Sequence, residues 1–246
     1  MDYLIGLDDT DNLESRGTGY LARQLAHYLQ SDRLAQVWGV TRHQLLISPE
    51  IKYTSHNSAV CILVSADELK ADNILAACRN FLTQHCASGS DAGFCFVDQN
   101  QVTSDIQDFA MRAKQQVLHK RQAAELAQAS RFYLEEISGN GSGIIGALAG
   151  VGLRAGGEDG RFLWLHGLRE LNGVYTVEEL LTQTGIQEVR SLDGNNLPME
   201  AQVDVGSWVR PLLRAGKAIL YVEEVNENGK FRCRILTKEH IKQLSN

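Results

Sequence analysis

Apolar and polar positions follow two patterns along this chain, and together they predict a mixed α/β protein. Short apolar runs bounded by polar residues or glycine indicate strands, and they fall at residues 3–7, 35–41, 58–64, 93–97, 132–137, 161–166, 187–192, 218–225 and 231–236. Apolar residues at helical spacing predict helices over residues 19–29, 67–85, 104–128, 144–153 and 177–184. Asn226-Glu227-Asn228-Gly229 predicts a hairpin turn between the last two strands.

The length of 246 residues fits one or two domains, because domains usually contain about 100–200 residues. The pattern changes near residue 130, where a long helical segment rich in Ala, Gln, Lys and Arg ends. We therefore expect two units, residues 1–130 and residues 131–246, although one compact unit would also fit the pattern.

The composition narrows the class of protein. Lys and Arg number 24 and Asp and Glu 30, so the formal net charge is −6, which argues against sequence-blind binding of nucleic acid but leaves room for a local basic cleft. No apolar run approaches the ~20 residues of a membrane span, and the N-terminus lacks the features of a signal peptide. The five cysteines form no CxxC pair. We therefore expect a cytoplasmic protein with free thiols, without a zinc ribbon or a membrane partner.

Three carboxylates follow the first predicted strand. Asp8, Asp9 and Asp11 lie within Asp8-Asp9-Thr10-Asp11, at a strand end of the kind where α/β proteins bind ligands. Clustered carboxylates repel one another unless a cation is present, and Mg²⁺ prefers carboxylate and phosphate oxygens with water. The loop therefore predicts either a Mg²⁺–nucleotide site or a turn whose Asp side chains cap the next helix.

Further polar segments are candidates for ligand binding. Gly17-Thr18-Gly19 stands at the start of a predicted helix, where backbone N–H groups bind anions and Thr18 could accept a phosphoryl group or simply cap the helix. His56 and Asn57 stand in a polar turn, where His56 could act as a base or bind phosphate and Asn57 could fix a ligand; an ordinary surface turn is the alternative. Asp91 precedes a strand and is either a further ligand or base, or a turn residue.

A glycine-rich loop precedes the predicted helix at residues 144–153. It follows a predicted strand, which is the context that a phosphate loop needs, but it lacks the GK[ST] ending of a Walker A motif. The backbone of Gly141, Ser142 and Gly143 is the candidate phosphate contact. Alternatively, the glycines only permit close packing of the helix.

These motifs, in this order, resemble a known enzyme family. Ile5-Gly6-Leu7-Asp8-Asp9-Thr10-Asp11 and Gly17-Thr18-Gly19-Tyr20-Leu21-Ala22 are similar to the GIDDTDS and GMCTTYLA blocks of the archaeal tRNA-isoleucine agmatinylcytidine synthetases, the TiaS family. Residues 53–60 are similar to the family's KTRGNGAV turn, residues 91–93 to its NPG turn, and residues 141–152 to its GRGLIGALAAIG segment. The resemblance covers about residues 3–155 and continues weakly through residues 168–181.

This resemblance implies a kinase-like nucleotide-binding domain over residues 1–130, followed by a ferredoxin-like α+β domain over residues 131–246. In the family, the kinase-like domain uses ATP to phosphorylate a tRNA cytidine, and agmatine then displaces the phosphate. A threonine of the family's CTTY motif is itself phosphorylated. The matching positions imply catalysis and metal binding for Asp8, Asp9 and Asp11, a phospho-accepting role for Thr18 and a place in the turn for Asn57. ATP and Mg²⁺ are the implied cofactors.

The chain also departs from the family. Ser55-His56 stand where the family has Arg-Gly, and Gly17-Thr18-Gly19 stand where it has Cys-Thr-Thr. The sequence is also expected to lack the OB-fold and zinc ribbon with which the family holds tRNA.

These departures leave three functions open. The first is an ATP- and Mg²⁺-dependent phosphotransferase or ATP-activating synthetase whose acceptor is unidentified and could be a small molecule. The second is a tRNA cytidine-modifying enzyme that acts with an RNA-binding partner protein. It predicts a basic surface that includes Arg42, Lys52, Lys114, Lys120 and Arg121. The third is a nucleotide-binding regulator without turnover. A homodimer is also left open.

Overall fold

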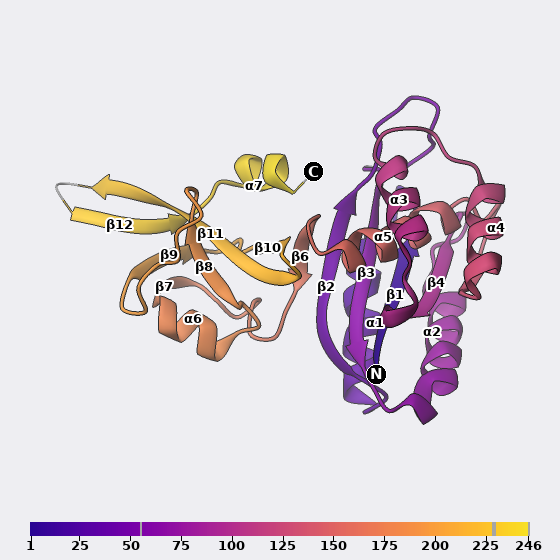
Figure 1. The fold of residues 1–246 in the computed structure, drawn as a ribbon, viewed down its shortest axis with the longest axis horizontal. Coiled ribbons are helices and arrows are strands. Elements are labelled where there is room, and N and C mark those ends of the chain that lie inside the picture. The colour runs from indigo at the N-terminus through magenta and orange to yellow at the C-terminus, as the bar shows by residue number, and fades with distance from the viewer. Residues whose placement is uncertain (55, 228–229, 246) are drawn as a thin grey trace.

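The computed structural model describes residues 1–54, 56–227 and 230–245, and it contains two lobes (Figure 1). Its strands form one 12-stranded sheet in the order β5-β4-β1-β3-β2-β6-β10-β11-β12-β9-β7, with β8 beside β11. The sheet therefore runs from one lobe into the other through β2 and β6. The predicted mixed α/β class is confirmed.

The first lobe begins with a β-α-β-β-α-β unit. Its elements are β1 (Asp2–Asp8), α1 (Thr18–Ser31), β2 (Gln36–Gln44), β3 (Ser58–Ser65), α2 (Ala71–His85) and β4 (Gly93–Asp98). Neighbouring strands are antiparallel and follow the order β4-β1-β3-β2, which is the ferredoxin-like topology. The ferredoxin-like topology expected of residues 131–246 therefore lies in residues 2–98 instead.

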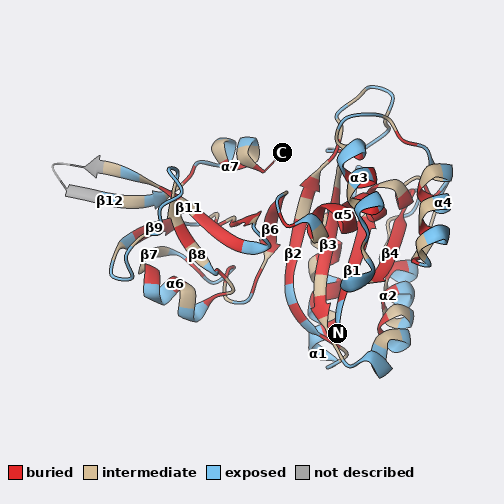
Figure 2. Ribbon diagram, in the orientation of Figure 1, coloured by how far each residue is buried: buried red, intermediate tan, exposed pale blue. Residues whose placement is uncertain are grey.

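Helices cover both faces of this part of the sheet. Helices α1 and α2 pack on one face around Leu25, Leu82 and Ile62. The elements α3 (Ser104–Ala113), α4 (Lys120–Ser130) and α5 (Ile144–Gly156) pack on the other face, and β5 (Tyr133–Glu136) extends the sheet beside β4. Figure 2 shows the result: the strands are mostly buried, and most exposed residues lie on the outer sides of the helices and in the loops.

The single helix predicted over residues 104–128 is wrong, because the chain forms α3 and α4 with a break between them. The Ala113 carbonyl at the end of α3 accepts a hydrogen bond from the Leu46 backbone N–H (3.1 Å). Helix α4 then begins with a capping box between His119 and Gln122. The first of these contacts joins residues far apart in the sequence, so helical spacing alone does not reveal the break.

The predicted division at residue 130 separates segments that share one core. Leu148 and Leu153 of α5 are buried in the same cluster as Leu4 and Cys61, whereas the next cluster along the chain begins at Phe162. We therefore propose that the domain boundary lies between residues 153 and 162.

The second lobe is formed by mostly short strands, the long strand β11 of 11 residues and two short helices. Its elements are β6 (Arg161–Trp164), β7 (Gly173–Thr176), α6 (Val177–Gln183), β8 (Glu188–Ser191), β9 (Gln202–Gly206), β10 (Leu212–Arg214), β11 (Lys217–Glu227), β12 (Lys230–Ile235) and α7 (Lys238–Leu244). The apolar pattern missed β7, β9 and β10, because runs of 3–5 residues carry few alternations. Strands β11 and β12 pair antiparallel as the hairpin pattern predicts, and Asn228 and Gly229 of its turn lie outside the described residues.

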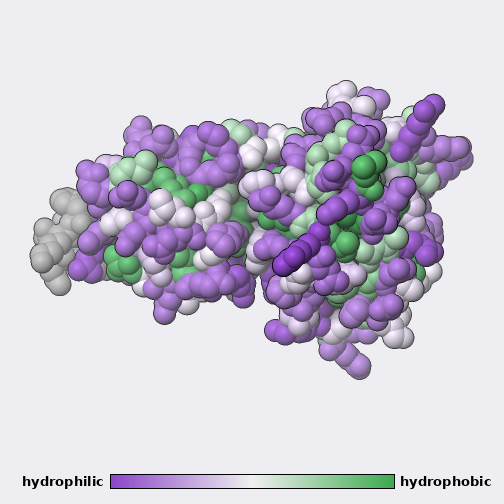
Figure 3. Space-filling view, turned by 90° about the horizontal axis from the view of Figure 1, so that it is seen from below, coloured by the Kyte–Doolittle hydropathy of each residue, from purple (hydrophilic) through white to green (hydrophobic). Residues whose placement is uncertain are grey.

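Seen from below, hydrophilic side chains cover much of both lobes, with apolar groups showing between them (Figure 3). In the part of the chain that the structure describes, none of the helices has the length and apolar character needed to cross a membrane.

Candidate functional site

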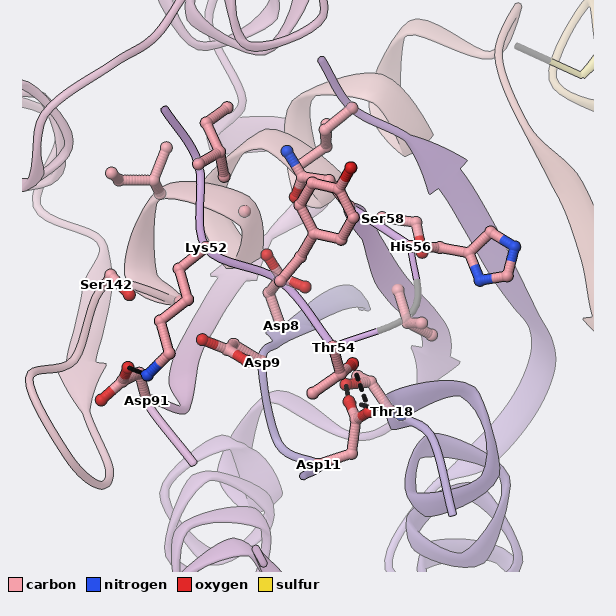
Figure 4. A pocket seen from close by; sticks show the side chains of 18 of the residues that line it. Asp8, Asp9, Asp11, Thr18, Lys52, Thr54, His56, Ser58, Asp91 and Ser142 are labelled. Carbon is pink, nitrogen blue, oxygen red and sulfur yellow. Dashed lines mark hydrogen bonds and ion pairs between the residues drawn. The ribbon is translucent and has the colours of Figure 1, made fainter. Parts of the chain in front are cut away.

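A cavity of about 930 Å³ opens at the carboxyl end of β1, where several loops of the first lobe meet. Most of the residues predicted from the sequence line it, namely Asp8, Asp9, Asp11, Gly17, Thr18, Gly19, His56, Asn57, Ser142 and Gly143, whereas Gly141 does not. Figure 4 shows that the side chains of Asp8, His56 and Ser142 come from separate segments of the chain. The fold thus brings together residues that are more than 100 positions apart in the sequence.

Asp8 and Asp9 form an acidic pair in this cavity. Asp8 ends β1, and Asp9 has a left-handed backbone (φ 51°), which Asp tolerates better than most residues. Burial, and then repulsion from Asp9, raise the pKa of Asp8 to about 7. Burial, and then repulsion from Asp91 and Asp11, raise the pKa of Asp9 to about 6. At neutral pH the pair therefore carries negative charge that a bound cation would stabilise.

Asp11 is occupied by hydrogen bonds from two threonines. Its Oδ1 accepts from the backbone N–H (3.1 Å) and the hydroxyl (2.8 Å) of Thr18, and its Oδ2 accepts from the hydroxyl of Thr54 (2.8 Å). Asp11 therefore caps the start of α1 and ties the loop at Thr54 to it, which is the capping role that the sequence left open for this cluster.

Thr18 lies at the first position of α1 and is 7% exposed. Its hydroxyl donates to Asp11 and accepts from the backbone N–H of Thr10 (3.2 Å). A hydroxyl held 2.8 Å from a carboxylate has the geometry of a nucleophile beside a base. The same contacts also stabilise the loop, so the geometry is compatible with both roles predicted for Thr18.

The glycine-rich loop uses its backbone N–H groups internally. Gly141 N–H donates to the Ser138 carbonyl (3.1 Å), Ser142 N–H to Asn140 Oδ1 (2.8 Å), and Gly143 N–H to the Asp91 carbonyl (2.9 Å). A Cβ on Gly143 would overlap the backbone of Asp8, Asp91 and Gly93. These contacts favour the packing role of the loop, since the donors predicted to bind phosphate already have acceptors.

Asp91 holds the glycine-rich loop against the cavity. Its Oδ1 accepts from the Asn140 backbone N–H (2.7 Å) and its Oδ2 from the Asn140 side chain (3.1 Å). Lys52 reaches the same carboxylate at 3.6 Å while its own side chain is 87% exposed, so this cation remains available to a ligand in the cavity. Sequence analysis placed Lys52 on a predicted basic surface and not in this cavity, and it gave Thr54 no role, although Thr54 lies within the segment 53–60 that resembles a family turn.

His56 and Asn57, which stand in the same turn, have different environments. Asn57 is buried, and its side-chain amide donates to the Leu46 carbonyl (2.7 Å), so it fixes the loop. His56 is exposed at the cavity and points away from the carboxylates (Figure 4). Burial, and then the positive charge of Arg42, lower the pKa of His56. Ser55, the other departure from the family motif, lies outside the described residues.

No protein-family model and no curated protein matches the chain. Among solved structures, a tRNA fluorescent labeling enzyme matches with 29% identity and a TM-score of 0.55, and it covers 62% of this chain. Apo TiaS, a tRNA agmatidine synthetase, matches with 27% identity and a TM-score of 0.53 over 62% of this chain. The chain resembles TiaS.

A third solved structure, the complex of TiaS with its tRNA and ATP, matches with 29% identity and a TM-score of 0.54. The resemblance predicted from the motif order is therefore confirmed. The chain spans 35–36% of the length of these TiaS chains and of the labeling enzyme.

The resemblance to TiaS implies Mg²⁺, so the carboxylates of the cavity can be compared with the ligands that this ion requires. Among the described residues, no group of three or more His, Cys, Asp or Glu side chains is arranged to hold a metal ion. Asp11, the third predicted ligand, is engaged by Thr18 and Thr54. Asp8 and Asp9 remain, and two carboxylates fit Mg²⁺, which proteins commonly hold through one or two carboxylates plus phosphate oxygens and water.

Proposed function

We propose that this protein is an ATP- and Mg²⁺-dependent phosphotransferase or ATP-activating synthetase, with its reaction in the cavity at the end of β1. The observation that carries this proposal is the acidic pair Asp8–Asp9, whose pKa values are raised to about 7 and about 6 in a cavity that also contains Arg42 and Lys52. Such a site has cation-binding carboxylates and phosphate-binding cations side by side. The likeness to an ATP-bound TiaS complex supports ATP as the ligand.

The residues of the cavity would have different roles in this reaction. Asp8 and Asp9 would hold Mg²⁺, which supplies charge neutralisation for the phosphates when bound. Lys52 would contact phosphate oxygens of ATP, because this cation lines the cavity and its side chain is 87% exposed. Asp11, Asn57 and Asp91 position the loops around these groups through their hydrogen bonds.

In the proposed transfer, an acceptor oxygen forms a bond to the γ-phosphorus of ATP while the bond to the bridging oxygen breaks, and ADP leaves with that oxygen. The proton of the acceptor passes to water in the cavity, because both carboxylates of the acidic pair would hold Mg²⁺.

The second candidate is modification of tRNA. Its support is the likeness to a TiaS structure that contains tRNA and to a tRNA fluorescent labeling enzyme. In this case the acceptor oxygen belongs to a nucleotide, and a small-molecule acceptor is excluded as the main substrate.

The decisive experiment incubates the pure protein with γ-labelled ATP and Mg²⁺, with and without bulk tRNA, and follows protein label, ADP and AMP. We expect turnover that falls about 100-fold or more in Asp9→Asn, because losing a carboxylate that would hold Mg²⁺ weakens charge neutralisation of the phosphates, and protein label that is lost in Thr18→Ala. Asp108→Asn, an exposed carboxylate on α3, is the matched control. Turnover stimulated by tRNA would favour the second candidate. ATP binding without turnover under all conditions would contradict both and favour a regulator.

A further inference from the structure

Two arginines face each other across the strand pair that joins the lobes. Arg42 of β2 is the register partner of Arg161 of β6, and like charges at opposed positions destabilise a sheet. Their hydrogen bonds go to neutral hydroxyls: Arg42 Nε donates to Ser58 Oγ (2.8 Å), and Arg161 Nη1 donates to Ser245 Oγ (2.8 Å). In the described part of the chain neither arginine has a carboxylate within ion-pair distance. Burial lowers the pKa of Arg42, and the negative charge of Asp8 acts against this effect. The buried Nε of Arg161 has no acceptor among the described residues.

Two more arginines extend this cluster. Within the described residues, Arg23 of α1 donates to the Gly19 carbonyl alone (2.9 Å). Arg210 donates to the Val209 carbonyl (2.6 Å), and its guanidinium lies 4.9 Å from the centre of the Trp208 ring. Burial and neighbouring arginines lower the pKa of Arg210 to about 10, and burial and Arg42 lower that of Arg161 to about 10. We call Arg23, Arg42, Arg161 and Arg210 the arginine cluster.

The arginine cluster runs from the cavity into the second lobe. Arg23 and Arg42 line the cavity, Arg210 precedes β10, and Arg161 is 5% exposed on β6, behind the surface. A partly buried cation without a counter-ion is costly. This arrangement is therefore the one expected where a ligand supplies the anion.

The basic residues that sequence analysis grouped together are, by contrast, mostly neutralised. Lys114 pairs with Asp159, Lys120 with Glu136, and Arg121 with Glu125. Lys52 approaches Asp91. Of that predicted set, only Arg42 belongs to the arginine cluster, and among the described residues it has no carboxylate within ion-pair distance, while Asp8 attracts it at longer range.

We propose that Arg23, Arg42 and Arg210 bind a phosphate group of the acceptor substrate at the junction of the lobes, with Arg161 adding positive charge behind Arg42. The planar guanidinium fork matches phosphate oxygens, whether in a monoester or in a diester. The second lobe thereby contributes to substrate binding. The assignment of this phosphate to the acceptor rests on the proposed function. The existence of an anion site at the arginine cluster does not rest on it.

The test measures the affinity for inorganic phosphate from the rise in melting temperature at constant ionic strength, with phosphate replacing chloride. We expect Arg210→Gln and Arg42→Gln to weaken phosphate binding by about tenfold or more, the loss of one charge-assisted contact. Arg210→Lys should recover part of it. Arg121→Gln, on the remote α4, should leave it unchanged. A wild-type protein without a phosphate-specific rise, or an Arg210→Gln variant with full affinity, would overturn the proposal.

Two further arms identify the source of the phosphate. Cytidine 5′-monophosphate offers a monoester, and a short oligoribonucleotide without terminal phosphates offers only diesters. If one of these two ligands competes with inorganic phosphate, and the competition depends on Arg210, the site is assigned to that kind of phosphate. If neither ligand competes, the assignment of the phosphate to the acceptor is overturned. ATP turnover is measured separately on the same samples. ATP turnover without an effect of phosphate on the melting temperature would disprove the arginine site and leave the proposed function standing. An effect of phosphate without ATP turnover would disprove the proposed function and leave the anion site standing.

Discussion

The carboxyl group of Asp8 is the most perturbed acid of the cavity, and its ionisation affects stability. Its pKa is raised to about 7 in the fold, chiefly by burial, from an ordinary value of 3.8. The folded state therefore holds this proton more tightly than the unfolded chain does. The favourable contribution of the Asp8 carboxyl to the free energy of unfolding is complete below pH 4 and is lost as the pH rises through 7.

Asp8→Asn should therefore stabilise the protein at pH 8 and change little at pH 4. The gain at pH 8 should be roughly 2–4 kcal/mol, because a shift of one pKa unit is worth about 1.4 kcal/mol. Urea unfolding at both pH values measures it, with Asp108→Asn as the exposed control. Equal destabilisation by Asp8→Asn at both pH values would mean that the carboxylate is structurally required.

Among the elements, α5 decides the shape of the cavity because it crosses the sheet at close range. Gly6 of β1 and Gly146 of α5 permit this approach: a Cβ on Gly6 would overlap the Ala147 carbonyl, and one on Gly146 would overlap the Asp8 carboxylate. Close packing of α5 is thus what buries Asp8 and raises its pKa. The glycines of this segment serve the site through packing.

Gly146→Ala should cost about 1–3 kcal/mol, the usual effect of overpacking a core. Gly156→Ala is the matched control in the same helix, because no atom lies within 4 Å of the added Cβ. It should stabilise the protein by about 0.5–1 kcal/mol through helix propensity. Thermal unfolding of the two variants measures both changes in stability. Equal changes in Gly146→Ala and Gly156→Ala would contradict the packing role of α5.

For the whole molecule, the connection between the lobes depends on a buried cluster beside the shared sheet. Asp159, in the loop before β6, accepts from His43 of β2 (2.9 Å) and pairs with Lys114 at the end of α3. Although burial acts in the opposite direction, these hydrogen bonds from His43 and Lys114 hold the pKa of Asp159 below its ordinary value. The stabilisation is therefore present above pH 4 and is lost as the pH falls through the lowered pKa.

Asp159→Asn should lower the free energy of unfolding by roughly 3 kcal/mol at pH 7, because it leaves a buried cation without its partner. Glu125→Gln, which removes the exposed partner of Arg121, should have little effect. Denaturant unfolding followed by the fluorescence of Trp38, Trp164 and Trp208 compares the two variants. A similar loss in both would show that the Asp159 cluster does not join the lobes.

Several features followed from the sequence because they depend on local order. Apolar spacing predicted β1, β3, β4, α1, α2 and α5 within a few residues, and the motif order predicted the resemblance to TiaS. The acidic loop, Thr18 and the turn at His56 and Asn57 do line one cavity. Their chemical roles stay predictions until the labelled-ATP experiment is done.

The remaining features depend on contacts between distant residues, which spacing does not encode. Hydrophobic period and residue order were enough for the α/β class, the loops that carry the carboxylates and the family likeness. The folded packing was needed to find that Asp11 caps α1, that the glycine loop packs instead of offering free N–H groups, and that Arg42 faces Arg161. Hydrogen-bond partners and like-charge neighbours are properties of that packing, which places together residues 42 and 161 although no pattern along the chain connects them.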